Sequence, residues 1–261
     1  FVVNYSESLS FSNLGTLVFT GAGTFVDEGV TVTDNLIEVS EGALYVVKTS
    51  TTSDKGLLVS GGTFRLSPDA KNKGTTAVYN GKADDVYSIV LEDGFIEIAE
   101  GCTLGGQNGV KLFNGELRTL HQEGLSANNA TISTDLVNAG ADITLTNSFG
   151  FWEYGTLTVT GTFAMYDGSF KPKIHGGASG KNDMLIVGGN VTINGEQNEL
   201  WPGTPETATG GGVVSPGGWT LLKSINGTID GEFDIVVLDK PGGGKYTLDL
   251  PVSEKWLGYK N

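Results

Sequence analysis

The sequence predicts an all-β protein built as a parallel β-helix, or solenoid, with an antiparallel β-sandwich as the alternative. The first observation is a recurring phrase: a Gly, a small or polar residue, then an apolar residue that opens an alternating run. It occurs at Gly15-Thr16-Leu17, Gly42-Ala43-Leu44, Gly62-Thr63-Phe64, Gly115-Glu116-Leu117, Gly155-Thr156-Leu157 and Gly161-Thr162-Phe163, and more loosely at Gly94-Phe95-Ile96. Gly42 and Gly62 lie 20 positions apart, and Gly94 and Gly115 lie 21 apart. A turn and a strand repeated at this period are typical of a solenoid.

Composition is the second observation. The 261 residues include 40 Gly, about twice the ordinary usage of roughly 7%, yet only 7 Pro, and 38% are apolar. The glycines therefore serve turns in a folded chain and not collagen or a disordered tail. The single Cys102 permits no internal disulfide, and we expect it to be a small buried residue.

Segments rich in Val, Ile, Thr and Phe are the third observation. They predict strands over 14–19, 29–39, 43–47, 57–66, 86–98, 131–145, 156–163 and 185–193. The segment 115–127 is compatible with a helix, but it opens with the repeat phrase and Gly124 interrupts it, so a strand is favoured. Some turn signals lie as close together as in a sandwich, so that alternative stays open. We expect a repeat-built solenoid over 1–165 and its end, with a β-rich cap, over 166–261.

The net charge of the chain limits the classes of partner that it can bind. The chain carries 30 acidic and 16 basic residues, a formal charge of −14, and only two Arg, Arg65 and Arg118. A surface that tracks phosphates is therefore excluded, and with it nucleic acid. No stretch approaches the roughly 20 apolar residues of a membrane helix, so we expect no membrane span. The acidic surface, rich in Thr, Ser and Asn, is typical of secreted β proteins.

The C-terminal third resembles a known family. Asp183-Met184-Leu185-Ile186-Val187-Gly188, then Thr220-Leu221-Leu222, then Gly231-Glu232-Phe233 follow one another in the order found at the end of bacterial autotransporter passenger domains with autotransporter-associated β-strand repeats. The match spans about 85 residues, from 167 onward; Gly21-Ala22-Gly23-Thr24-Phe25 resembles the repeat more weakly. The resemblance implies a right-handed parallel β-helix displayed outside a bacterial cell, often as an adhesin or structural element. The β-barrel that follows such passengers is missing here, so we expect a processed piece or another export route.

Within this third, residues 198–218 are rich in Pro, Gly and Thr and predict a long surface loop. Trp201 lies between Asn198 and two prolines, Pro202 and Pro205. An exposed Trp at this place would stack on a sugar or anchor a neighbour, whereas a Trp folded back would cover the edge of the core.

Catalytic and metal sites have weak candidates. A glycosidase or polysaccharide lyase would need carboxylates, and Asp84 and Asp85 are the only adjacent Asp pair. We favour the interpretation that both are solvated turn residues. The two Arg that a lyase would use as base lie in separate repeats. Asp183 ends a Gly-rich stretch that is similar to one Ca²⁺-binding nonapeptide, and a plain turn is favoured there too. We expect no cofactor beyond weakly bound Ca²⁺, and no enzyme.

Contact surfaces complete the functional expectations. The apolar alternation of Phe1, Val3 and Tyr5, and of Leu9 and Phe11, predicts an uncovered strand able to pair with another subunit. Within the aromatic cluster at 149–154, alternation places Trp152 and Tyr154 on one face of a strand. They form either a contact patch or part of a thickened core. The leading hypothesis is an extracellular or cell-surface structural protein that self-assembles into a filament or layer. A monomeric adhesin that binds cell-surface glycans is the alternative, and a polysaccharide-degrading enzyme is third.

Overall fold

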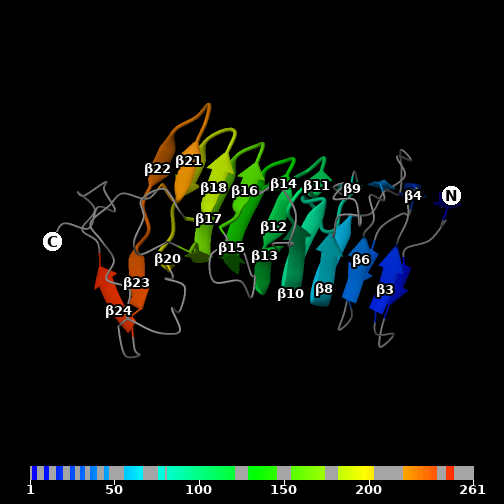
Figure 1. Cartoon of the computed structure of the whole chain (residues 1–261), viewed down its shortest axis with the longest axis horizontal. Helices are drawn as coiled ribbons and strands as arrows, with labels where there is room; N and C mark the ends of the chain where they lie inside the picture. Colours follow the sequence, from blue (N-terminus) through cyan, green and yellow to red (C-terminus); the bar gives the residue numbers. More distant parts are fainter. Residues whose placement is uncertain are drawn as a thin grey trace.

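The structure is a computed structural model of the whole chain. It describes residues 2–4, 9–11, 16–19, 24–26, 30–32, 36–39, 44–46, 56–66, 76–79, 81–120, 129–145, 154–173, 182–202, 220–239 and 245–249. These residues form 24 strands and no helix. The strands stack side by side along the long axis of the molecule, from β1 at one end to β24 at the other (Figure 1).

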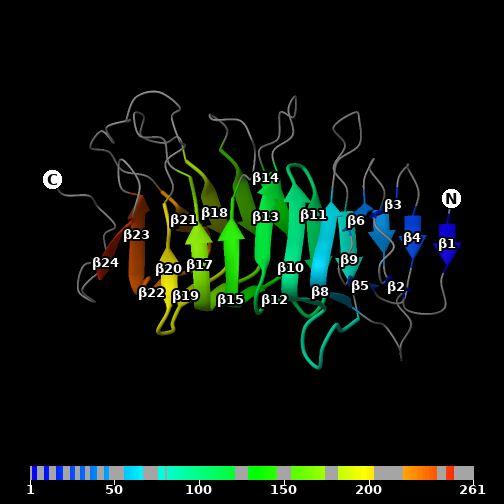
Figure 2. The same ribbon diagram turned by 90° about the horizontal axis from the view of Figure 1, so that it is seen from below.

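The strands belong to two sheets that run the length of the stack (Figure 2). The nine-stranded sheet contains, in spatial order, β1 (Val2–Asn4), β4 (Thr24–Val26), β7 (Leu44–Val46), β9 (Thr76–Tyr79), β11 (Thr103–Gly106), β14 (Asn129–Ile132), β16 (Thr156–Val159), β18 (Met184–Val187) and β21 (Leu222–Ser224). The 15-stranded sheet contains β2 (Leu9–Phe11), β3 (Thr16–Phe19), β5 (Val30–Val32), β6 (Leu36–Val39), β8 (Leu57–Leu66), β10 (Ile89–Ala99), β12 (Val110–Leu112), β13 (Glu116–Leu120), β15 (Leu136–Thr144), β17 (Phe163–Lys171), β19 (Val191–Ile193), β20 (Asn198–Leu200), β22 (Ile229–Gly231), β23 (Ile235–Asp239) and β24 (Lys245–Asp249). The chain passes from one sheet to the other in each coil.

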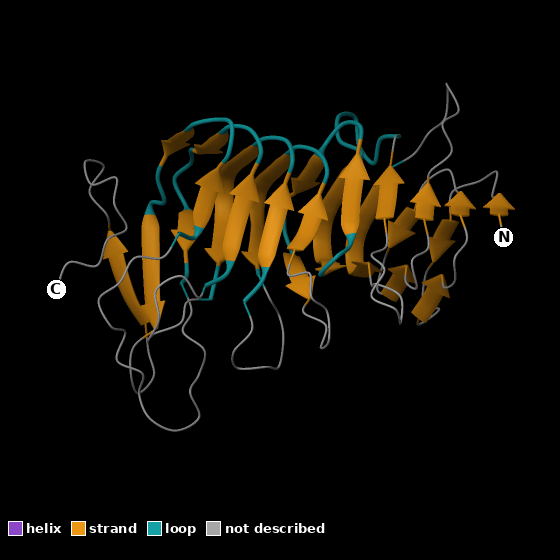
Figure 3. Cartoon of the chain, turned by 45° about the horizontal axis from the view of Figure 1, so that its top comes forward, coloured by secondary structure: helices purple, strands orange, loops and turns teal. Residues whose placement is uncertain are grey.

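The pairing decides between the two predicted architectures. Each described strand pairs in parallel with the strand one coil away, and only β23 and β24 pair antiparallel. A sandwich would pair consecutive strands antiparallel. The predicted parallel β-helix is therefore confirmed, and the connecting turns gather along its edges (Figure 3).

Inward-pointing apolar side chains stack coil on coil. The register aligns one such row at the start of the bent sheet, and each member is at most 1% exposed: Leu57, Ile89, Val110, Leu136, Phe163 and Val191. Burying one side chain of this kind stabilises the fold by about 1.5–3 kcal/mol. Cys102 is fully buried, as predicted.

Two glycines of the repeat phrase, Gly94 and Gly115, lie at bends in the larger sheet, whereas Gly155 and Gly161 lie before β16 and between β16 and β17. Gly94 and Gly115 have positive φ angles of 85° and 77°, which favour Gly because other residues are strained there. A Cβ added to Gly115 would lie 2.4 Å from the carbonyl oxygen of Gly94 on the next coil. Asp93 supports the bend by accepting a hydrogen bond of 2.8 Å from the Gly94 amide. Each coil therefore turns at a stacked row of glycines and presents a second strand segment beyond it.

The two ends of the stack differ. At the N-terminal end, β1, β2 and β3 each pair with one described strand, namely β4, β5 and β6. At the C-terminal end, β21 and β22 likewise each pair with one described strand, β18 and β19, whereas β23 pairs in parallel with β20 on one side and antiparallel with β24 on the other. Strand β24 is the outermost strand at this end (Figure 1).

Several predicted boundaries need correction. The run 29–39 contains two strands, β5 and β6, and the run 131–145 contains β14 and β15, which residues 133–135 separate. The strand favoured within 115–127 is present as β13. The loop predicted over 198–218 is wrong at its start, since Asn198–Leu200 forms β20 and pairs with Gly168–Phe170. The rest of that loop from residue 203 onward, 203–218, lies outside the described residues.

Candidate functional site

The two arginines of the chain meet on one outer face. The register places Arg65, Glu97 and Arg118 side by side on β8, β10 and β13, and extends the row to Thr144 on β15 and Lys171 on β17. These five residues are called the charged column. The two Arg lie in separate repeats, but the inference that they are isolated from each other is wrong, because residues of successive repeats are neighbours in a solenoid.

Glu97 is the centre of the charged column. Its carboxylate lies 2.6 Å from Arg65 Nε and 3.5 Å from Arg118 Nη1, and its side chain is only 6% exposed. Arg118 also contacts Glu116 Oε2 at 2.6 Å, and its guanidinium lies 3.8 Å from the centre of the Phe95 ring. A nearly buried carboxylate needs such partners. The contacts therefore tie three successive coils together through side chains.

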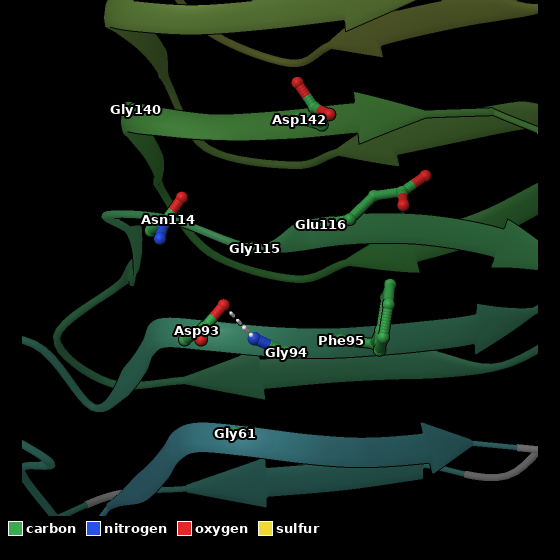
Figure 4. A pocket seen from close by; sticks show the side chains of 9 residues that line it. All are labelled: Gly61, Asp93, Gly94, Phe95, Asn114, Gly115, Glu116, Gly140 and Asp142. Carbon is green, nitrogen blue, oxygen red and sulfur yellow. Dashed lines mark hydrogen bonds between the residues drawn. The ribbon is translucent and has the colours of Figure 1, made fainter.

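A groove of about 530 Å³ follows the bend beside the charged column (Figure 4). Its floor is backbone, because four of its lining residues are glycines on successive coils: Gly61, Gly94, Gly115 and Gly140. Polar and aromatic side chains line the rest: Asp93, Phe95, Asn114, Glu116 and Asp142. Glu116 and Asp142 are register partners on β13 and β15, so their carboxylates follow one another along the axis.

Lys171, at the far end of the charged column, lies beside Trp201. Lys171 Nζ lies 2.5 Å from Asp142 Oδ2 and 5.1 Å from the centre of the Trp201 ring. Asp142 also accepts a hydrogen bond from the Ser169 hydroxyl. The Trp201 indole donates to Glu199 Oε2 at 2.6 Å, and the residue is half-buried. Trp201 is therefore held against the outer face of the solenoid, and its contact with a sugar or a neighbour stays a prediction.

An exposed aromatic patch lies on the other side of the same bend. It consists of Val86, Tyr87, Phe113 and Tyr166, with Lys111 among them. Phe113 is 41% and Tyr166 49% exposed, and Lys111 Nζ lies 4.1 Å from the Phe113 ring centre and 5.2 Å from that of Tyr87. Burial raises the pKa of the Tyr87 phenol, and Asp84 and Tyr166 raise it further. The sequence analysis missed this patch.

Asp84 anchors the segment that carries part of the aromatic patch. Its Oδ1 accepts hydrogen bonds from the amides of Val86 and Tyr87, at 2.7 and 2.6 Å. Asp85 is exposed, and its carbonyl accepts from Lys82 Nζ at 2.9 Å. The structure thus places the adjacent carboxylates in a turn, where Asp84 orients Tyr87.

Asp183 has a similar backbone role at the other side of the molecule. The residue is fully buried, and its carboxylate accepts hydrogen bonds from the amides of Gly155 and Lys173, each at 2.8 Å. Burial raises the pKa of the nearby Tyr154 phenol, and the Asp183 charge adds to the shift. Tyr154 is half-buried. Asp183 therefore joins two chain segments next to β18.

The predicted contact residues of the N-terminal segment are partly described. Val3 lies in β1, and Leu9 and Phe11 lie in β2, both at the N-terminal edge of their sheets. Phe1, Tyr5 and Trp152 lie outside the described residues.

Within the described ranges, no three or more His, Cys, Asp and Glu side chains are grouped so as to hold a metal ion. The same ranges contain no helix of the length and apolarity that a membrane span requires. Comparison of the chain with protein-family models, with curated proteins and with solved structures gives no match.

Proposed function

We propose that the chain is an extracellular structural protein, a stiff solenoid that joins further copies through the edge formed by β1, β2 and β3. The observation that carries the proposal is the one-sided pairing of these three strands among the described residues. A strand paired on one side presents backbone N–H and C=O groups on the other, and these can pair with a strand of another chain. The extracellular location rests on the acidic composition and on the resemblance to autotransporter passengers.

Stiffness follows from the same ladders. Parallel hydrogen bonds continue from coil to coil in both sheets, and the charged column adds ion pairs across β8, β10 and β13. In a solenoid each coil is stabilised by its neighbours, so an additional coil supplied by another molecule stabilises the terminal one. At the opposite end, β24 pairs antiparallel to β23 and so ends the parallel ladder on that part of the sheet.

The test is negative-stain electron microscopy and sedimentation velocity of the purified chain over a range of concentrations. We expect rods joined end to end, and single rods when residues 1–14 are deleted or when Val3 and Leu9 are both replaced by Lys. The matched control is Gln107→Lys and Thr160→Lys, which adds the same charge at exposed positions on middle coils of the solenoid. Joined rods that persist in the β1–β2 variants, or single rods at every concentration of the unchanged chain, would refute the proposal.

A further inference from the structure

We propose that the groove and the aromatic patch form one binding surface for an extended polysaccharide that lies along the solenoid axis, and that this glycan is neutral or carries amino groups. The inference goes beyond the assembly proposed above, because it concerns the side of the solenoid and does not require contacts at its ends.

The spacing of the exposed aromatic side chains follows from the register. Leu112, Asn138 and Met165 are register partners on β12, β15 and β17. Phe113 and Tyr166 come directly after Leu112 and Met165, so the two aromatic residues lie two coils apart. On the coil between them the register shifts by one residue, so that Ala139 pairs with Asp167 and Tyr166 lies at the irregularity. Two strand spacings amount to about 10 Å, which is the length of a disaccharide. Phe113 and Tyr166 are thus spaced to contact alternate sugars of a chain that crosses the coils, and aromatic rings provide the apolar contact area that such ligands need.

Polar groups for sugar hydroxyls line the adjoining groove. Asn114 directly follows Phe113 and lines the groove together with the carboxylates of Asp93 and Glu116. Glu116 is held in place by Arg118 at 2.6 Å, and the Asp93 carboxylate by the Gly94 amide at 2.8 Å. A ligand therefore finds acceptors that are already oriented, which lowers the entropic cost of binding. Apolar contact beside a few placed polar groups is the usual composition of a small-ligand site.

Charge selects the class of glycan. The chain has a formal charge of −14, and Asp93, Glu116 and Asp142 line the groove. Glu116 and Asp142 are ion-paired with Arg118 and Lys171, so the excess negative charge at the groove comes from Asp93 and from the acidic chain as a whole. Lys111, the cation of the aromatic patch, already lies over the rings of Tyr87 and Phe113. Like charges oppose uronate, sulfate and phosphate groups, and they also oppose a second copy of this acidic chain on the same face. A neutral or amino-bearing polysaccharide meets no such penalty.

The experiment is isothermal titration calorimetry of the full chain, at a concentration where it sediments as single molecules. The probes are cellohexaose, a chitosan hexamer and hexagalacturonate. We expect cellohexaose or the chitosan hexamer to bind and hexagalacturonate not to bind. Phe113→Ala and Tyr166→Ala should each weaken binding about tenfold, because each removes one stacking contact. Ile225→Ala, at a position 57% exposed and remote in sequence, is the matched control and should bind as the unchanged chain does.

Circular dichroism and thermal unfolding establish that the variants are folded, which we expect because both aromatic residues lie on the surface and outside the buried core. Binding of hexagalacturonate alone, binding of none of the three probes, or equal affinity in the unchanged chain and in Phe113→Ala and Tyr166→Ala would overturn the proposal. A change of sedimentation coefficient in the two aromatic variants without a change in saccharide affinity would assign the aromatic patch to contacts between copies and would also overturn it. Each of these outcomes leaves the test of β1–β3 assembly unaffected.

Discussion

Replacement of Glu97 by Gln tests whether the charged column stabilises the solenoid. Gln keeps the shape of the side chain and one acceptor oxygen, but it leaves Arg65 and Arg118 facing each other without the carboxylate between them. Breaking a buried ion pair costs about 3–5 kcal/mol, and breaking an exposed one about 0–1. Glu97 is nearly buried, whereas the Arg65 and Arg118 side chains are 32% and 22% exposed and keep part of their hydration. We therefore expect a loss of about 2 kcal/mol in the free energy of unfolding.

The assay is equilibrium unfolding in urea, followed by circular dichroism and by Trp fluorescence. Coincident transitions are needed first, because a stack of coils can lose cooperativity. The control is Glu92→Gln, which removes one negative charge at an exposed position of the same strand and should change the free energy of unfolding by less than about 0.5 kcal/mol. Equal stability of the two variants would refute the stabilising role of the charged column. A loss for Glu97→Gln that persists at high salt would indicate that burial limits screening of these contacts.

Two further predictions concern the bend and the aromatic patch. Gly115→Ala should lower the free energy of unfolding by at least about 2 kcal/mol in the same urea assay, because φ is positive and the Cβ would lie 2.4 Å from a backbone oxygen; an unchanged midpoint would contradict the proposed role of the repeat glycine. The pKa of Tyr87, raised by burial and then by Asp84, should fall toward its ordinary value of about 10 in Asp84→Asn, which keeps an acceptor oxygen for the Val86 and Tyr87 amides. The raised pKa means that folding favours the protonated phenol, so this stability is present below pH 10 or so and is lost as pH rises through the folded pKa. Difference titration of tyrosinate absorbance against Tyr87→Phe measures the shift, and a pKa unchanged by Asp84→Asn would contradict the assignment.

The sequence was sufficient to predict the fold because the repeat phrase marks a structural position. Gly94 and Gly115 open the phrase, and both lie at bends with positive φ; at Gly115 the neighbouring coil also approaches too closely for a side chain. Three residues of the charged column follow the phrase directly: Arg65, Glu97 and Arg118 each stand three residues after a phrase glycine. The sequence therefore contained the pattern that marks these residues as neighbours. It was hard to recognise because the spacing along the chain is unequal: 32 residues from Arg65 to Glu97 and 21 from Glu97 to Arg118.

The aromatic patch could not be predicted from alternation. Phe113 and Tyr166 lie where the strand pattern is broken by a bend, so an inward or outward direction cannot be assigned from parity alone. For Trp201 the prediction of a loop was wrong at this position. The neighbouring Pro and Gly indicated a loop, but Leu200 pairs with Phe170 and places Trp201 on the outer face. In both cases the three-dimensional register between coils, which local composition does not encode, decides exposure.

The proposed assembly and the proposed polysaccharide binding use different surfaces of the solenoid. Assembly uses hydrogen bonds along the axis at the ends, whereas the groove and the aromatic patch lie on the side and span several coils. If β1, β2 and β3 receive a parallel coil from another molecule, the bend of that coil continues the row of bends, and the lateral surfaces of the two molecules come into line. A polysaccharide that spans several such surfaces would bind them with an effective concentration set by the rod, so that weak contacts at each Phe113 and Tyr166 add up to strong retention. A stiff solenoid is suited to this arrangement because its side chains keep the spacing that its backbone ladder imposes.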